Sequence, residues 1–310
     1  MAELKPFRGN YYLWQYLPST AAAGIFVALF ILGTGYVTWK VVRTRTYFCI
    51  VFIIGGILEI VGYCARAASR DKTDQLIPYV IQSTFILVAP ALFAASIYMV
   101  LGRVIRGVHA EIRSLVPVRW LTTIFVCGDV FSFVIQASGA GLMATGNSMT
   151  TGQNVILAGL VIQILMFGLF AVVAAIFHAR VRRWPTGAFL DRRPIWTKTM
   201  IMLYTVSILI LVRSVFRVIE YAMGQDGYLL KHEWTLYVFD ATLMFGVVAM
   251  FAWMFPSQQT LMATRDEEVS GQEALDGERD PQTSSVLQLN YAESSEAPTH
   301  ETKKTRSTKY

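Results

Sequence analysis

Long runs of apolar residues, separated by short polar segments, recur along the chain. A helix needs about 20 apolar residues to cross the hydrocarbon core of a bilayer, and seven runs reach this length. Because backbone polar groups in lipid find partners only within the chain, each run is expected to be an α-helix. The pattern predicts an all-α polytopic membrane protein, a seven-transmembrane-helix bundle over 17–255, with spans at 17–39, 46–66, 76–101, 119–143, 153–178, 197–221 and 234–255.

Composition agrees with this class. Of the 310 residues, 54% are hydrophobic and 15% charged, whereas soluble domains are about 45–50% apolar and about 25% charged. The segment 256–310 is rich in Ser, Thr, Glu and Gln and has too few apolar residues to form a core, which predicts a disordered tail. The net charge of +6 reflects basic residues that flank the spans, so no nucleic-acid partner is expected.

Basic residues are divided unequally between the two sides of the predicted bundle. Under the positive-inside rule, the richer side is cytoplasmic, so we expect the N-terminal segment 1–16 outside and the tail 256–310 inside. Spans of about 21–26 residues favour the plasma membrane. The richer side carries twelve basic residues: Lys40, Arg43, Arg45, Arg103, Arg106, Arg113, Arg119, Arg180, Arg182, Arg183, Arg192 and Arg193. The poorer side carries six: Lys5, Arg8, Arg66, Arg70, Lys72 and Lys231.

Charged and amide side chains interrupt the apolar runs at helical spacing. Within four of the spans they recur at i, i+3 or i+4, and i+7, which places them on one face of each helix. A charged side chain facing lipid at mid-span costs about 2.5–3.5 kcal/mol or more, so these faces are expected to turn inward. The candidate ligand-binding residues are Glu59, Tyr63, Arg66, Gln82, Asp129, Gln136, Gln163, Arg213, Arg217, Glu220, Glu233, Tyr237 and Asp240.

The embedded charges do not balance, because three arginines face five carboxyl groups. Protonation or a cationic ligand would offset the acidic surplus. Most of these residues fall in the outer half of the predicted bundle, which predicts a water-accessible cavity that opens outward. A second interpretation stays open, in which the charges form a buried ion-pair network that fixes helix register and binds no ligand.

Small residues and one proline predict details of the packing. Close helix approach is expected at Gly55 and Gly56 and at Ala137 and Gly141. Pro90 lies in the middle of the third span, where it should kink the helix and free a backbone carbonyl.

Five motifs occur in order along the chain. They are Glu-x-x-Gly-Tyr-x-x-Arg at 59–66, Gln82 followed by Ala89-Pro90 and Tyr98, Asp-x-x-Ser-x-x-x-Gln-x-x-Gly-x-Gly at 129–141, Arg-x-x-x-Arg-x-x-Glu-Tyr at 213–221, and His-Glu-x-x-x-Tyr-x-x-Asp at 232–240. Over about residues 10–256 the sequence resembles the fungal lipid-translocating exporter family, the seven-spanning proteins named for resistance to aminocholesterol.

The resemblance implies a fungal integral membrane protein. Members are linked to export of sphingoid bases, to resistance against sterol analogues and drugs, and in one case to porphyrin uptake. It brings no agreed ligand or catalytic residues, so the candidate residues above rest on the charge pattern alone. We expect a membrane transporter or translocator of amphiphilic lipids or lipid-like toxins, with membrane lipids and an amphiphilic small molecule as partners. A seven-helix receptor, or a stress sensor without transport, is the alternative.

No enzymatic activity, cofactor or metal is expected. An intramembrane zinc hydrolase would need about three converging histidines. His109 and His178 are predicted inside, His232 outside and His300 in the tail, so they cannot converge. The chain also lacks the Gly-rich phosphate loop that ends in Lys-Ser or Lys-Thr.

Overall fold

The computed structural model describes residues 16, 18–71, 75–107, 117–144, 149–183, 193–223, 227, 229 and 232–256. These residues belong to one compact unit, Met1–Met262. The expected N-terminal segment 1–16, apart from Tyr16, and the expected tail, apart from Pro256, lie outside the described residues.

Every described regular element is helical, and seven helical spans are long and apolar enough to cross a membrane. The prediction of an all-α, seven-helix, multi-pass membrane protein is confirmed. The helices are α1 (Thr20–Thr44), α2 (Ile50–Ala68), α3 (Leu76–Gly107), α4 (Val118–Ala144), α5 (Met149–Arg183) and α7 (Arg193–Ala222). The seventh span consists of α9 (Glu233–Leu236), the π-helical turn η4 (Tyr237–Ala241) and α10 (Thr242–Trp253), and short 3₁₀ turns η1 (Tyr47–Cys49) and η2 (Ser69–Asp71) flank α2.

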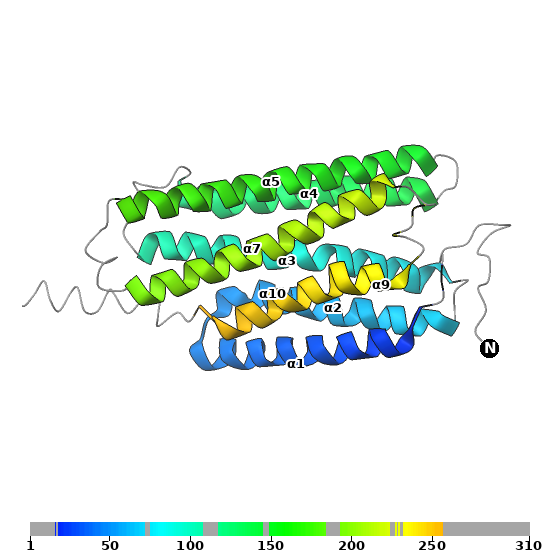
Figure 1. The fold of residues 1–310 in the computed structure, drawn as a ribbon, viewed down its shortest axis with the longest axis horizontal. Helices are drawn as coiled ribbons and strands as arrows, with labels where there is room; N and C mark the ends of the chain where they lie inside the picture. The colour runs from blue at the N-terminus through cyan, green and yellow to red at the C-terminus, as the bar shows by residue number, and fades with distance from the viewer. Residues whose placement is uncertain are drawn as a thin grey trace, which may run out of the picture. The chain divides into compact units, whose positions relative to one another are not determined.

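Successive spans run in opposite directions along a common axis (Figure 1). In Figure 1, α1 and α2 form one side of the unit, α4 and α5 form the other, and α7 crosses obliquely between them. Helix α3 contacts α2, α4, α5 and α7 and is the most enclosed of the seven spans. It therefore connects both sides of the bundle.

Several helices extend beyond the apolar runs that predicted them. The fifth span was expected at 153–178, whereas α5 covers Met149–Arg183. Its last turn holds Arg180, Arg182 and Arg183, whose positive charge suits the carboxyl end of a helix. Helix α1 begins at Thr20 rather than at residue 17, because the Ser19 side chain caps it by accepting from the Ala22 N–H at 3.4 Å.

Glycines let two helix pairs approach closely. A Cβ atom at Gly55 would lie 3.2 Å from the Ala89 carbonyl oxygen, so α2 and α3 meet there as predicted. A Cβ atom at Gly139 would lie 2.7 Å from the Gly152 carbonyl oxygen, so α4 and α5 meet at Gly139. The expected contact at Gly141 is wrong, because nothing would lie within 4 Å of a Cβ atom there. Two residues along a helix amount to more than half a turn, so Gly141 faces away from α5.

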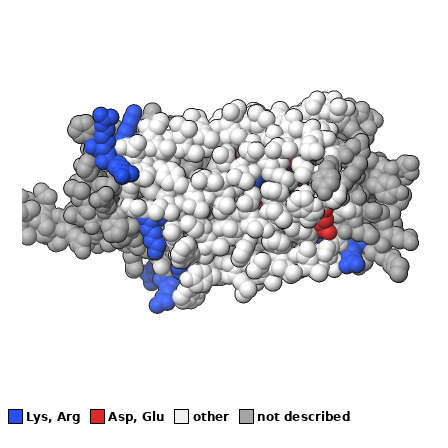
Figure 2. Space-filling model, in the orientation of Figure 1, with Lys and Arg blue, Asp and Glu red and all other residues white. Residues whose placement is uncertain are grey.

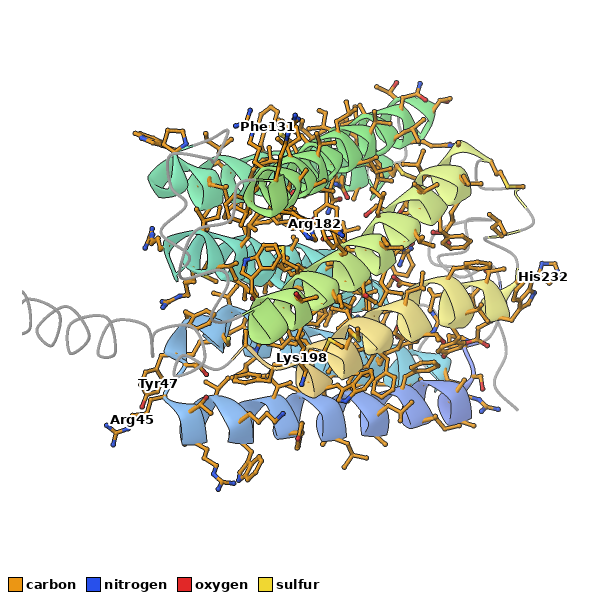
Figure 3. The ribbon with its side chains drawn as sticks, turned by 60° about the vertical axis from the view of Figure 1, so that its left-hand side comes forward. Arg45, Tyr47, Phe131, Arg182, Lys198 and His232 are labelled. Carbon is orange, nitrogen blue, oxygen red and sulfur yellow. The ribbon has the colours of Figure 1, made fainter. Side chains whose placement is uncertain are left out.

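The exterior of the unit is largely apolar between two polar ends. Large apolar side chains such as Leu32, Phe131 and Leu165 are 60–71% exposed, as expected for a surface that faces lipid. Lys and Arg side chains gather at one end of the face in Figure 2, hereafter the basic end. Figure 3 shows Arg45 and His232 pointing away from opposite ends.

Candidate functional site

The seventh span changes its helical pattern where it meets the charged core. Between α9 and α10 the turn η4 is π-helical, and the Thr242 hydroxyl donates to the Tyr237 carbonyl oxygen at 2.9 Å. Single π-helical turns inside α-helices are rare and are frequent at functional sites. This turn contains Asp240, whose side chain is fully buried.

Asp240 lies between two arginines of α7. Arg213 Nε donates to Asp240 Oδ1, and Arg217 Nη2 donates to Asp240 Oδ2 at 2.6 Å. Arg217 Nη1 also donates to Glu220 Oε2 at 2.9 Å. The planar guanidinium presents its donors in a fixed fork, so one arginine can bridge two carboxylates. We call Arg213, Arg217, Glu220 and Asp240 the α7–η4 network.

The proline of α3 takes part in this network. Pro90 has no N–H, so the carbonyl oxygen of Ile86, four residues earlier, receives no helical hydrogen bond from it. Arg213 Nη2 donates to this oxygen at 2.9 Å. The carbonyl that the sequence predicted to be freed is therefore the one that binds an arginine of the network.

Glu59 on α2 lies near the α7–η4 network but, unlike the members of the network, it has no hydrogen-bond partner among the described residues. Its side chain is fully buried, and neither carboxylate oxygen has a hydrogen-bond partner among the described residues. It is close enough to Asp240, Arg213 and Arg217 to interact with them electrostatically. Buried carboxylates are normally paired or hydrogen-bonded, because desolvation without partners is costly. With all groups ionised, Glu59 and the network combine two positive and three negative charges.

A second ion pair lies at the end of the bundle opposite the basic end. Arg66 Nη2 donates to Glu233 Oε1 and to the Tyr16 hydroxyl, both at 2.9 Å, and Arg66 Nε donates to the Tyr237 hydroxyl at 3.1 Å. The Ser19 N–H also donates to Glu233 Oε1 at 2.8 Å. This pair is balanced in charge and joins α2, α9 and the start of α1.

An aromatic layer separates Glu59 from the Arg66–Glu233 pair. Tyr63 follows Glu59 by one turn of α2, and its ring stacks with Phe26, Phe30 and Tyr237 at centroid distances of 5.7–6.3 Å. The Tyr63 hydroxyl is buried and has no partner among the described residues. We call Phe26, Tyr63 and Tyr237 the aromatic layer.

Four predicted residues, on α3, α4 and α5, belong neither to the α7–η4 network nor to the Arg66–Glu233 pair. Asp129 of α4 accepts a hydrogen bond from the Tyr98 hydroxyl of α3 at 2.9 Å. Gln136 Nε2, two turns further along α4, donates to Gln163 Oε1 of α5 at 3.1 Å. The charged and amide residues predicted to face inward are thus divided among separate centres. One of the two surplus negative charges belongs to the group formed by Glu59 and the network, and the other belongs to Asp129. Gln82 of α3 is buried, and its Oε1 has no partner in the described part of the chain.

The charged core is closed in this conformation. Glu59 and Asp240 are 0% exposed, and the Arg217 side chain, at 13%, is the most exposed of the network. In the middle of the face in Figure 2, only a few atoms of charged residues show between atoms of residues other than Lys, Arg, Asp and Glu. The expected outward opening therefore does not reach these side chains. Tyr63 and Arg66 follow Glu59 along α2, so the aromatic layer and the Arg66–Glu233 pair lie on the side of Glu59 away from the basic end.

Some residues of the site give little signal in the sequence. Phe26 looks like an ordinary member of an apolar run, and Tyr98 stands out only as part of a motif. Tyr16 precedes the first predicted span, and Ser19 lies at its start. Their roles depend on contacts between helices that are distant in sequence. No group of three or more His, Cys, Asp or Glu side chains that could hold a metal occurs among the described residues.

These features define an integral, multi-pass membrane protein of seven helices with a charged cluster inside its apolar core. The chain belongs to the RTA1-like family, since residues 52–262 match the family described as RTA1 like protein. The resemblance to the fungal lipid-translocating exporters is thereby confirmed.

Three relatives from Saccharomyces cerevisiae illustrate the similarity. Protein RTM1 is 44% identical over 221 residues, which cover 71% of each chain. Protoporphyrin uptake protein 1 is 37% identical over 280 residues, which cover 78% of this chain and 91% of that protein. Sphingoid long-chain base transporter RSB1 is 30% identical over 250 residues, which cover 69% of this chain and 65% of that protein. No solved structure matches the chain.

Proposed function

We propose that the protein moves amphiphiles with a cationic head group across the membrane and so contributes to efflux or resistance. The observation that carries this proposal is Glu59, a fully buried carboxylate without a hydrogen-bond partner among the described residues. A ligand ammonium group would supply the N–H donors that Glu59 lacks and the positive charge that the cluster lacks. The apolar chain of such a ligand suits the surrounding hydrocarbon-like side chains.

The names of the relatives support a transport function of this kind. RSB1 is named as a transporter of sphingoid long-chain bases, and a sphingoid base is an amine on a long alkyl chain. Protoporphyrin uptake protein 1 is also named for the movement of an amphiphilic molecule. None of the three relatives carries an enzymatic name, which supports a protein without catalytic residues.

The route to Glu59 leads through the aromatic layer. Tyr63 and Arg66 follow Glu59 along α2 toward the end opposite the basic end. A head group that enters from this side has to part the Tyr63–Tyr237 stack and the Arg66–Glu233 pair. The positive-inside rule assigns the basic end to the cytoplasm, so this entrance faces outward, and we propose the plasma membrane as its location.

Reconstitution in liposomes tests the proposal. The transbilayer movement of a labelled sphingoid base is compared with that of its N-acetylated, uncharged analogue, for the wild type, Glu59→Gln and Cys64→Ala. Cys64 lies on the same helix with an exposed side chain, so its variant is the matched control. We expect the wild type and Cys64→Ala to move the amine faster than empty liposomes and faster than the analogue. Glu59→Gln should lose this preference for the amine.

Two outcomes would contradict the proposal. One is a rate no greater than that of empty liposomes with correctly folded protein. The other is equal movement of the two probes by the wild type. Binding of the amine without movement would instead support the receptor or sensor function.

A further inference from the structure

Asp129 forms a second acidic centre in the bundle. Its side chain is 3% exposed, and its Oδ2 accepts a hydrogen bond from the Tyr98 hydroxyl at 2.9 Å. Its Oδ1 is buried and has no hydrogen-bond partner among the described residues. No arginine pairs with it in the described part of the chain, in contrast to Asp240.

The described helices around Asp129 bring few groups that could compensate a negative charge on its carboxylate. From α3 comes Tyr98, the one described titratable group that acts on it, and the Tyr98 ring packs against Phe125, Phe167 and Phe170. On α4 itself, the Ser132 hydroxyl donates to the backbone carbonyl of Asp129 rather than to its carboxyl group. On α5, Phe167 and Phe170 pack against Tyr98, and the uncharged Gln163 accepts from Gln136. A negative charge at Asp129 is therefore poorly compensated.

We propose that Asp129 is a proton-binding site within the membrane, separate from the Glu59 site. On uptake, a proton from water forms a bond with Oδ1, and the carboxylate becomes a neutral acid while Tyr98 still donates to Oδ2. On release, that O–H bond breaks and the proton returns to water. A metal cation is a poor alternative, because hard cations take about six to eight oxygen ligands, whereas one orphan oxygen suffices for a proton.

Helix α3 connects this site with the α7–η4 network. Its Tyr98 binds Asp129, its Ile86 carbonyl accepts from Arg213, and Pro90 lies between them. A change at Asp129 therefore reaches the network through a single helix that a proline interrupts. This coupling of the proton to translocation rests on the proposed function, whereas proton binding itself does not.

Infrared difference spectroscopy of the full chain in lipid, between about pH 5 and about pH 9, tests proton binding. We expect the carbonyl stretch of a protonated carboxyl group in the wild type and its loss in Asp129→Asn. The band should persist in the Cys64→Ala control. Tyr98→Phe keeps the carboxyl group but removes its donor, so it should shift the band. A band that Asp129→Asn and Tyr98→Phe leave unchanged, or the absence of any band, would overturn the proposal.

If Asp129→Asn does not fold, the shift of the carbonyl band in Tyr98→Phe tests proton binding by itself.

A transport measurement with and without a proton gradient tests the coupling of the proton to translocation. We expect the gradient to change the rate in the wild type and in Cys64→Ala, whereas Asp129→Asn should give one rate under both conditions. A wild-type transport rate that is the same with and without the proton gradient would overturn the proposed coupling. If no amphiphile moves at all, the proposed function fails, and the infrared band still decides whether Asp129 binds a proton.

Discussion

At the scale of single residues, Asp240 is the centre of the charged core, because it accepts from Arg213 and Arg217 at once. Both guanidinium groups donate to the carboxylate of Asp240, and Arg213 also donates to the Ile86 carbonyl oxygen. Removal of one partner from such a buried cluster leaves the others uncompensated. The same network can therefore fix the positions of α7 and the seventh span while it shapes the environment of Glu59.

Asp240→Asn should lower the free energy of unfolding by about 3–5 kcal/mol, because it removes the carboxylate that pairs with the buried Arg213 and one of the two carboxylates that pair with Arg217. Chemical unfolding in mild detergent measures this loss. Cys64→Ala, at an exposed position, should stay within about 0.5 kcal/mol of the wild type. An Asp240→Asn protein as stable as that control would contradict the role of Asp240 in the network.

The charged residues of the core could be predicted individually, whereas their partners could not. Spacing and the cost of charge in lipid were sufficient to place Glu59, Arg213 and Asp240 on inward faces. The separation of Asp129 from the arginines depends on which helices are neighbours, and a single sequence does not specify that. Tyr98 belongs to one of the five motifs, but the charge pattern gave no reason to pair it with Asp129, since a tyrosine in an apolar run is usually a core residue.

At the scale of elements, α3 links the two acidic centres. The Ile86 carbonyl is available to Arg213 because Pro90 lacks the N–H that would otherwise bind it. A proline in mid-helix usually weakens a helix, but here the freed carbonyl gains a charged donor. The proline thus provides a hydrogen bond between α3 and α7.

Pro90→Ala should separate the effect of the proline on the regularity of α3 from its effect on the hydrogen bond between α3 and α7. The new N–H at position 90 would compete with Arg213 for the Ile86 carbonyl, so α3 becomes more regular while α7 loses a contact. We expect unfolding at the same or a higher temperature together with slower amphiphile movement in liposomes. Wild-type movement in this variant would show that the Arg213–Ile86 bond has no part in function.

The existence of the helices could be predicted from apolar length, but some of their details could not. Apolar runs measure the part of a helix that lies in lipid, so they missed the basic last turn of α5. The π-helical turn η4 was also missed, because an apolar run of this length predicts only that a helix spans the membrane. Close helix approach was expected at Ala137 and Gly141, whereas α4 and α5 meet at Gly139, since small residues at helical spacing do not specify which face of the helix is used.

At the scale of the whole molecule, the difference between the two ends predicts the orientation in the membrane. The described helix ends at the basic end carry Arg43, Arg103, Arg106 and Arg180, while Arg66 and Glu233 form a pair toward the other end. A small tag at residue 1 should react with a membrane-impermeant reagent in intact cells. A tag at residue 310 should react only after permeabilisation. The reverse pattern would place the entrance to Glu59 on the cytoplasmic side.

The most direct measurement is equilibrium binding of a long-chain amine and its N-acetylated analogue to the purified protein. We expect the wild type and Cys64→Ala to bind the amine more tightly, and Glu59→Gln to weaken amine binding by about tenfold, or about 1.4 kcal/mol, with little effect on the analogue. Equal affinity for the two probes, or an unchanged affinity of Glu59→Gln for the amine, would contradict recognition of a cationic head group by the buried acidic cluster.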